Sequence, residues 1–478
     1  MTTNSLYASV DIGSNSFRLE IGKLVHGQIT RSEYLKETIR LGAGLDTYRN
    51  LSQESMSCGW DCLARFGERL AGFKPHQVRA VATQTLREAR NREIFIRRAQ
   101  EVLGFPIDVI SGPEEARLIY KGVSHFLPES NEKRLVIDIG GRSTELILGK
   151  SYLPEVMNSF RVGSFSWSKK YFSDGKFDNP SFEKARIAAQ AILDEALALF
   201  PKQSWDVAFG SSGTVGAIAD MLDRAGWPVG VISRESLDWL KRQFVRFGHV
   251  GRLQMDGLKE DRKEVIGGGI SVLDAVMEMF NIEILYIAHG GLRHGVLYEM
   301  LDRKTAIPDA RNQSVLRLQN MFGVDQIQAR RVEQVARYFL DPLLKEGPEE
   351  EALRHKRKLS WAAQLHELGN IISHSDAHKH GAYILEHADV TGFALTELHR
   401  LGLLVLGQKG KLKKVMIDHD DKWFFIQMMC LRLAVILCHA RKDPAYESLS
   451  LQADIDKELF ILKSKQGWSD KHPQSAHL

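Results

Sequence analysis

The chain has 478 residues, of which 44% are hydrophobic and 26% charged, as in ordinary globular proteins. At roughly 150 residues per domain, this length allows about three domains with cores of their own. The formal net charge of +4 is compatible with an anionic ligand but does not indicate a nucleic-acid-binding protein, and we expect no nucleic-acid partner.

Features of secreted and membrane proteins are missing from the sequence. No charged N-terminal segment precedes an apolar run, so we expect no signal peptide. No window of about 18 apolar residues occurs, so we expect no membrane span. Four cysteines are too few and too clustered for a disulfide framework. These observations together predict a cytoplasmic protein.

One stretch occurs twice, at residues 8–23 and again at residues 135–150. The two copies share Asp, Ile, Gly, Ser, Leu, Gly and Lys at matching positions. Each predicts a buried strand, a tight polar turn and a returning strand. Each turn offers a carboxylate, glycine and hydroxyl residues, which suit a metal ion and a phosphate. Two such turns facing each other would hold a phosphate from both sides.

After the first hairpin, a glycine-rich turn at residues 40–45 precedes a helix that we expect at 52–72. A strand at 78–83 is followed by a helix predicted over 84–103. Arg87 lies at this strand-to-helix junction, where a guanidinium can bind a phosphate at the helix N-terminus. The alternative is a surface arginine, because several arginines follow it in the sequence.

Another strand, at residues 107–110, leads into a helix that begins near Ser111. Ser111 and Glu114 have the spacing of a capping box, and Pro113 suits the first turn. Glu115 has no such structural role. It is either a partner of the helix dipole or a general base, and the local sequence alone favours the dipole.

The second hairpin, at residues 135–150, is followed by alternating strands and helices as far as about residue 305. Residues 207–214 form a strand that runs into a turn of small residues, which suits either a close ligand approach or tight packing. Glycine turns recur at the ends of later strands. Such turns suit a ligand cleft between two α/β lobes. Beyond residue 305 the pattern becomes helical, and His366, His374, His378 and His380 raise the question of a metal.

Seven motifs in chain order resemble the exopolyphosphatase / guanosine pentaphosphate phosphohydrolase family. They are Asp11–Ser16, Ala82–Ala89, Ser111–Leu118, Asp138–Glu145, Gly210–Thr214, Arg262–Ile266 and Leu292–Leu297. The resemblance implies an α/β protein with two duplicated ribonuclease H-like (actin-like) lobes and a cleft between them. An all-α HD-like C-terminal domain follows. The implied domains are 1–127 for the first lobe, 128–305 for the second and 306–478 for the helical part.

The resemblance also implies roles for individual residues. Glu115 is the catalytic glutamate, joined by Asp138 and Glu145 as catalytic residues. Asp138, Glu145 and Asp11 are the expected metal ligands, with Mg²⁺ as the cofactor and Mn²⁺ as the alternative. The expected phosphate-binding residues are Asn15, Ser16, Arg18, Arg87, Gly141, Arg142, Ser143, Thr144 and Gly213.

Two departures from the family pattern stand out. Arg142 occupies a position where the family usually has a third glycine, and it would either add a phosphate contact or block the backbone approach. Ala288 and His289 replace the usual Ser-Asp or similar pair.

In the helical part Glu367 stands where His-Asp is expected, so we expect no second active site there. The residues expected to line a basic path for a long anion are Lys379, His380, Lys409, Lys411, Lys413 and Lys414.

The implied reaction is hydrolysis of the terminal phosphate of inorganic polyphosphate, with Glu115 as the general base. Guanosine pentaphosphate, a signal of the stringent response, is the alternative substrate. A kinase or chaperone-like ATPase and a non-catalytic sensor are the competing interpretations; Arg142 favours the sensor, whereas the three carboxylates oppose it. We also expect a homodimer with the helical tails near its interface.

Overall fold

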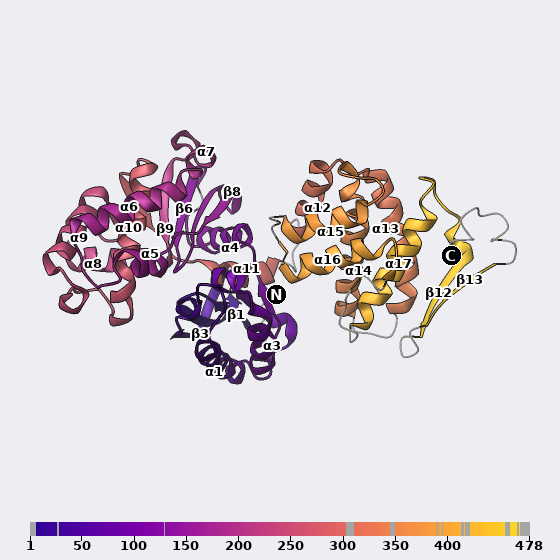
Figure 1. Cartoon of the computed structure of the whole chain (residues 1–478), viewed down its shortest axis with the longest axis horizontal. Helices are drawn as coiled ribbons and strands as arrows, with labels where there is room; N and C mark the ends of the chain where they lie inside the picture. The colour runs from indigo at the N-terminus through magenta and orange to yellow at the C-terminus, as the bar shows by residue number, and fades with distance from the viewer. Residues whose placement is uncertain are drawn as a thin grey trace. The chain divides into compact units, whose positions relative to one another are not determined.

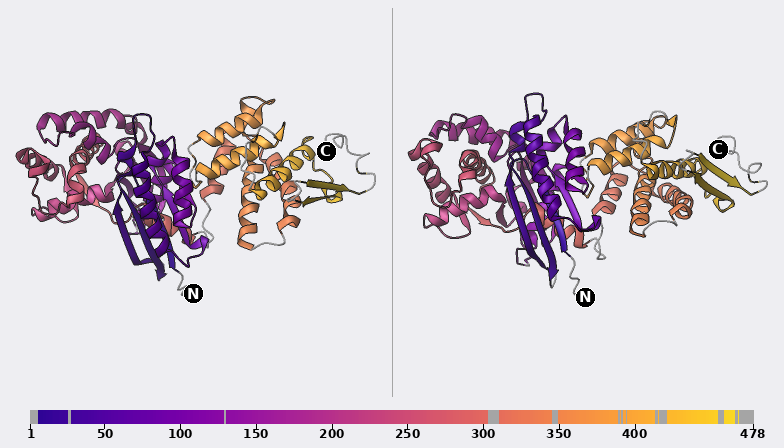
Figure 2. Two further views of the ribbon diagram at one scale, coloured as in Figure 1. Left: turned by 60° about the horizontal axis from the view of Figure 1, so that its bottom comes forward. Right: turned by 90° about the horizontal axis from the view of Figure 1, so that it is seen from below.

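The computed structural model describes residues 6–25, 28–128, 130–302, 310–344, 349–388, 390, 392–393, 395–412, 415, 421–454, 459–465 and 468. The chain forms two compact units, Met1–Ile307 and Pro308–Leu478 (Figure 1). The first unit contains two mixed sheets with helices packed on them, and the second is mainly helical (Figures 1 and 2). The predicted fold class is confirmed, whereas the boundary at 127 stays a prediction.

The first sheet has the order β3-β2-β1-β4-β5. Its strands are β1 (Leu6–Ile12), β2 (Ser16–Val25), β3 (Gln28–Thr38), β4 (Val78–Ala82) and β5 (Ile107–Val109). β1 is antiparallel to β2 and parallel to β4, which is parallel to β5. The carboxyl ends of β1, β4 and β5 therefore share one edge of the sheet. This edge places Asp11, Thr83 and Ser111 close to one another in the fold.

The helices of the first lobe are α1 (Gln53–Arg69), α2 (Gln84–Glu88), α3 (Arg92–Leu103) and α4 (Gly112–Ser124). The prediction of one helix over 84–103 is wrong, because the helix breaks between α2 and α3. Asn91, in the break, exchanges hydrogen bonds with the backbone of Leu51 at 2.8 and 3.0 Å. These tertiary contacts outweigh the helical pattern of the local sequence.

The second sheet repeats the plan of the first, in the order β10-β11-β9-β6-β7-β8. Its strands are β6 (Lys133–Ile139), β7 (Thr144–Lys150), β8 (Leu153–Phe160), β9 (Val207–Ser211), β10 (Val231–Ser233) and β11 (Ile284–Ile287). β6, β7, β8, β9 and β11 occupy the places of β1, β2, β3, β4 and β5. The duplication read from residues 8–23 and 135–150 therefore extends over both sheets.

The second lobe buries its core around α10, a glycine-rich helix that is buried along most of its length. Aromatic side chains from several helices pack with it, among them Phe172, Phe182 and Phe244. The helices of this lobe are α5 (Ser164–Tyr171), α6 (Asn179–Leu193), α7 (Ala196–Leu199), α8 (Ser212–Arg224), α9 (Arg234–Phe247) and α10 (Lys263–Met279). The last helix of the unit, α11 (Leu292–Asp302), packs on the first lobe, where Val296 and Leu297 share a core with Val81 of β4.

Helices α4 and α11 pack backbone against backbone. A Cβ added to Gly122 would collide with the carbonyl oxygen of Gly291, and one added to Gly295 would collide with that of Leu118. Only glycine allows this approach. The contact fixes α4, which carries Glu115, against the helix that carries Arg293 and His294.

The second unit packs its helices around a core that includes Phe339, Trp361 and Phe393. Its elements are α12 (Ala310–Met321), α13 (Gln326–Leu340), α14 (Glu349–Gln364), α15 (Ala377–His387), α16 (Leu395–Gly407), α17 (Lys422–Leu437), β12 (Leu449–Asp454) and β13 (Leu459–Ser464). The β12–β13 hairpin was not predicted by the sequence pattern. Among the described residues, no helix is long and apolar enough to cross a membrane.

Candidate active site

The two repeated turns face each other, as the sequence predicts. A Cβ added to Gly141 in the second turn would lie 3.5 Å from the Cβ of Ser14 and 3.7 Å from that of Asn15 in the first. The side-chain oxygen and nitrogen of Asn15 are both buried without a hydrogen-bond partner among the described residues. A buried amide of this kind indicates a missing polar partner, which a phosphate can supply.

Four carboxyl groups gather beside the turns: Asp11 at the end of β1, Glu115 in the first turn of α4, Asp138 in β6 and Glu145 in β7. The β6–β7 register places Asp138 directly opposite Glu145. Asp11, Glu115 and Glu145 are each less than 9% exposed. Burial raises all four pKa values above their ordinary range, and neighbouring carboxyl groups raise those of Glu115, Asp138 and Glu145 further.

Glu115 owes its position to the start of α4. Ser111 caps the helix by accepting a hydrogen bond from the backbone N–H of Glu114 at 3.2 Å, as predicted. Glu114 forms ion pairs with Arg117 and so has a structural role. Burial raises the pKa of Glu115 and Asp11 raises it further, although Arg87 donates to its Oε2 from 2.7 Å. A carboxyl group with a raised pKa suits proton transfer near neutral pH.

Asp138 and Glu145 have hydroxyl partners that the sequence analysis did not single out. Burial raises the pKa of Asp138 to about 6, against a hydrogen bond from Ser211. Burial, Glu115 and Asp138 raise the pKa of Glu145 well above its ordinary value. Ser159 donates to Glu145 Oε1 at 2.7 Å. The register of β6 with β9 and of β7 with β8 brings these hydroxyls into place, and that register is not visible in the sequence.

This carboxyl cluster fits a divalent cation. Hard cations prefer oxygen ligands, and Mg²⁺ usually takes one or two carboxylates and completes its shell with water and substrate phosphates. In the part of the chain that the structure describes, no three His, Cys, Asp or Glu side chains are arranged to hold a metal alone. The cluster therefore fits a metal that shares phosphate oxygens better than one enclosed by protein.

Arginines lie on the other side of the cluster, near the start of α8. A Cβ added to Gly213 would collide with Arg262 Nη2 and would lie 3.4 Å from Arg18 Nη2. The pKa of Arg262 is lowered by burial and by the like charge of Arg18. Arg262 makes no ion pair with the residues described here, whereas Arg18 Nη1 lies 3.8 Å from Asp11 Oδ2 and Arg18 Nε is buried without a partner among them. Two guanidinium groups this close to each other indicate an anion beside them.

The backbone beside these arginines is strained. Ser212, the residue before Gly213, has a φ of 90°, which is unusual for a residue with a side chain. Its hydroxyl accepts hydrogen bonds from the N–H groups of Thr214 and Val215, both at 3.2 Å. Strain of this kind concentrates at ligand sites, where the surrounding fold maintains it.

Arg293 links the first-lobe carboxylates to α11. Its Nη1 lies 3.8 Å from Asp11 Oδ2, and its Nε donates to Glu20 Oε2 at 3.2 Å. His294 Nε2 lies 3.1 Å from the other oxygen of Glu20. Arg262 and Arg293 were not among the predicted site residues. Both lie in motifs that carried the family resemblance, and this was the one feature of the sequence that could have indicated a role for them in the site.

Three of the side chains predicted to bind phosphate have protein partners in this structure. Thr144 is fully buried and donates its hydroxyl to the carbonyl of Val162 at 2.6 Å. Arg87 is bonded to Glu115, to the carbonyl of Ile110 and to Gln84. Arg142 pairs with Glu88 in the first lobe. The structure thus brings Arg87 to the site through Glu115 and joins Arg142 to Glu88 in the first lobe.

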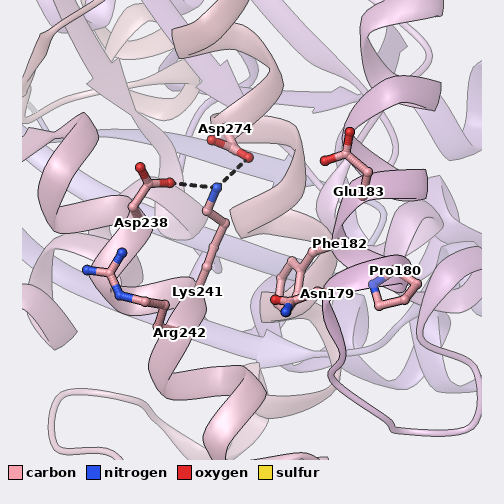
Figure 3. Close-up of a pocket in the computed structure, with 8 residues that line it drawn as sticks. All are labelled: Asn179, Pro180, Phe182, Glu183, Asp238, Lys241, Arg242 and Asp274. Atoms are coloured by element: carbon pink, nitrogen blue, oxygen red, sulfur yellow. Dashed lines mark hydrogen bonds and ion pairs between the residues drawn. The ribbon is translucent and has the colours of Figure 1, made fainter.

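A cavity of about 540 Å³ lies elsewhere in the second lobe, between α6, α9 and α10 (Figure 3). Figure 3 shows Lys241 between two carboxylates, with its Nζ 2.7 Å from Asp238 and 2.8 Å from Asp274. None of the predicted site residues lines this cavity, and Lys241 is already paired with two carboxylates there.

In the helical unit, Glu367 forms an ion pair with Arg441 at 2.7 Å, and the buried His366 contacts the carbonyl of Ala363. Of the predicted basic residues, Lys379 and Lys409 are exposed, and Lys409 Nζ donates to the carbonyl of Ser375 at 3.4 Å. The segments around residues 375–380 and 409–411 therefore lie side by side. Lys413 and Lys414 lie outside the described residues.

Comparison with known proteins agrees with this architecture. Residues 21–304 match the model of the Ppx/GppA phosphatase family, and residues 310–477 match that of Ppx/GppA phosphatase domain III. An exopolyphosphatase from Cytophaga hutchinsonii is similar in fold at 24% identity, covering 63% of this chain and 98% of its own, with a TM-score of 0.58.

The Aquifex aeolicus member of the Ppx/GppA family is 25% identical, covering 63% of this chain and 99% of its own, with a TM-score of 0.54. The family match extends over both lobes and continues through the helical unit. The chain belongs to the Ppx/GppA phosphatase family and is a hydrolase of phosphoanhydride bonds.

Proposed function

We propose that this enzyme is an Mg²⁺-dependent exopolyphosphatase of the cytoplasm, which releases orthophosphate from the end of inorganic polyphosphate. The observation that carries the proposal is the buried group of four carboxyls together with the guanidinium groups of Arg18 and Arg262, which both lie beside Gly213. The end of a polyphosphate chain fits both the carboxyls and the arginines, because its oxygens can ligate a cation held by the carboxyls and can accept hydrogen bonds from the guanidinium groups.

Asp138 and Glu145 would hold the metal together with phosphate oxygens, and the ion would offset the charge of the reacting phosphoryl group. Arg18, Arg262 and the N–H of Gly213 bind the non-bridging oxygens, and the Asn15 amide bonds the phosphate between the turns. Glu115 accepts a proton from water as the new P–O bond forms and the bridging P–O bond breaks. The shortened chain leaves with the electron pair of the broken bond.

The choice between substrates is tested directly. Purified protein is offered long-chain polyphosphate, guanosine pentaphosphate and ATP separately, each with Mg²⁺, and released phosphate is measured. We expect the highest kcat/KM with polyphosphate. A higher value with guanosine pentaphosphate would replace the proposed substrate, and phosphate release from ATP alone would favour an ATPase.

Replacing Arg262 by alanine is expected to weaken substrate binding. A charged hydrogen bond contributes about 1.5–3 kcal/mol, so KM for polyphosphate should rise about 10- to 100-fold. Arg252→Ala removes the same charge from an exposed position in the same lobe and is the matched control. Equal effects of the two substitutions on KM would show that KM depends only on the overall charge of the lobe and not on the position of Arg262.

The exposed lysines of the helical unit are proposed to bind long polyphosphate. Lys379→Glu combined with Lys409→Glu should raise KM for long chains several-fold and leave tripolyphosphate hydrolysis unchanged, because a short chain makes fewer contacts. Lys463→Glu with Lys465→Glu, on exposed positions of the terminal hairpin and its end, is the control of equal charge. Salt-dependence of KM for long chains should fall in the first variant only.

A further inference from the structure

Arg142 connects the second lobe to the first. It lies in the turn between β6 and β7, and its Nη2 donates to Glu88 Oε2, at the end of α2, from 2.8 Å. Its Nη1 donates to the carbonyl of Gly42 at 3.3 Å. The side chains of Arg142 and Glu88 are 22% and 12% exposed, so the pair is largely shielded from solvent. Shielding strengthens such a pair and weakens its screening by salt.

Glu88 continues the connection inside the first lobe. Gln84 Nε2 donates to Glu88 Oε1 at 2.6 Å, and Gln84 Oε1 accepts from Arg87 Nη2 at 2.7 Å. Only one orientation of the Gln84 amide satisfies both partners, so the carboxylate of Glu88 sets that orientation. Arg87 then donates to Glu115 Oε2 at 2.7 Å. An unbroken series of hydrogen bonds therefore runs from Arg142 to the proposed base.

We propose that Arg142 is a positioning residue, which holds Arg87 against Glu115 through Glu88 and Gln84 when the two lobes are together. The inference rests on the proposed function of Glu115 and assigns a role to the arginine that replaces a glycine in the second turn. Arg142 bonds to Glu88 Oε2, the carboxylate oxygen that Gln84 leaves free. Because its charge is paired in this way, Glu88 does not draw Arg87 away from Glu115. Without Arg142, the unpaired carboxylate of Glu88 competes with Glu115 for the Arg87 guanidinium.

The test is a double-mutant cycle on polyphosphate hydrolysis. Arg142→Ala is expected to lower kcat about 3- to 30-fold with little change in KM, a range typical of coupled neighbours. Glu88→Gln keeps an acceptor for Gln84 and should lower kcat less. The double variant should be no slower than Arg142→Ala, because both changes remove the same pair, and Arg142→Lys should recover most of the lost kcat. Arg246→Ala, which removes an exposed arginine of the same lobe, is the matched control.

A second readout needs no turnover. Cys58 is exposed on the first lobe while Cys62, Cys430 and Cys438 are buried, so spin labels can be placed at Cys58 and at Val229→Cys on the second lobe, a position that is 77% exposed. The distance distribution between the labels should broaden in Arg142→Ala and stay unchanged in Arg246→Ala. This measurement remains informative if the protein proves inactive on polyphosphate. Failure of the role proposed for Arg142 and failure of the proposed function are therefore distinguishable.

Two results would overturn the inference. One is a double variant whose loss in kcat equals the product of the single losses, which would show that Arg142 and Glu88 act independently. The other is an Arg142→Ala variant that matches Arg246→Ala in both kcat and label distances.

Discussion

Glu115→Gln is expected to lower kcat for polyphosphate hydrolysis by about 10²–10⁴-fold, the usual contribution of a general base. The amide keeps the size of the side chain and can still accept from Arg87, but it cannot take the proton of the attacking water. KM should therefore change much less than kcat. Steady-state phosphate release over a range of chain concentrations measures both quantities.

The control for this substitution is Glu101→Gln, which removes an exposed glutamate from α3 in the same lobe and should leave kcat unchanged. A Glu115→Gln enzyme with kcat within about threefold of the wild type would remove Glu115 from the chemistry, because a base contributes far more. A parallel fall in kcat for both variants would point to a loss of folded protein.

Asp138→Asn is expected to abolish turnover and, in metal-free protein, to raise stability at neutral pH. Burial raises the pKa of Asp138 from 3.8 to about 6. The folded state therefore binds a proton more tightly than the unfolded state, and this stabilisation is complete below about pH 4 and lost as the pH rises through 6. At 1.36 kcal/mol per pKa unit, the ionised carboxyl costs on the order of 3 kcal/mol above pH 6. Asparagine removes that cost.

The cost of ionising Asp138 is measured by thermal unfolding in EDTA at about pH 4.5 and about pH 8, which lie on either side of a pKa of roughly 6. The advantage of Asp138→Asn over the wild type should be larger at pH 8. Adding Mg²⁺ should raise the unfolding temperature of the wild type more than that of the variant, because the variant lacks a proposed ligand. Asp223→Asn, at an exposed position of α8, should show neither dependence. An advantage that is the same at both pH values would mean that Asp138 does not ionise as its surroundings imply.

Local sequence was sufficient where the signal lies within one short segment. The repeated turns, the Ser111 cap and the carboxyl residues at strand ends were all predicted, because strand alternation and turn chemistry are written in neighbouring residues. The repeat of residues 8–23 at residues 135–150 predicted the two facing turns, whereas the duplicated lobes were implied by the family resemblance and are seen in two sheets of equivalent strand order.

Features that depend on distant partners could not be predicted. Arg142 read as either a phosphate ligand or an obstruction, and its partner Glu88 lies 54 residues earlier in the chain. The break between α2 and α3 depends on Asn91 bonding to Leu51, 40 residues away. Ser159 reaches Glu145 only through the β7–β8 register. Each of these contacts depends on how distant segments are brought together by the fold, and this cannot be predicted from the residues of one segment.

Phosphate release from long-chain polyphosphate by the wild-type protein, measured first in EDTA and then across a titration with Mg²⁺, tests the central claim most directly. We expect no release in EDTA and a saturable rise with Mg²⁺, with each released orthophosphate shortening a chain from its end. Equal release with and without the metal would contradict the role given to Asp138 and Glu145. No release at any Mg²⁺ or Mn²⁺ concentration from protein that is folded would contradict the proposed activity itself.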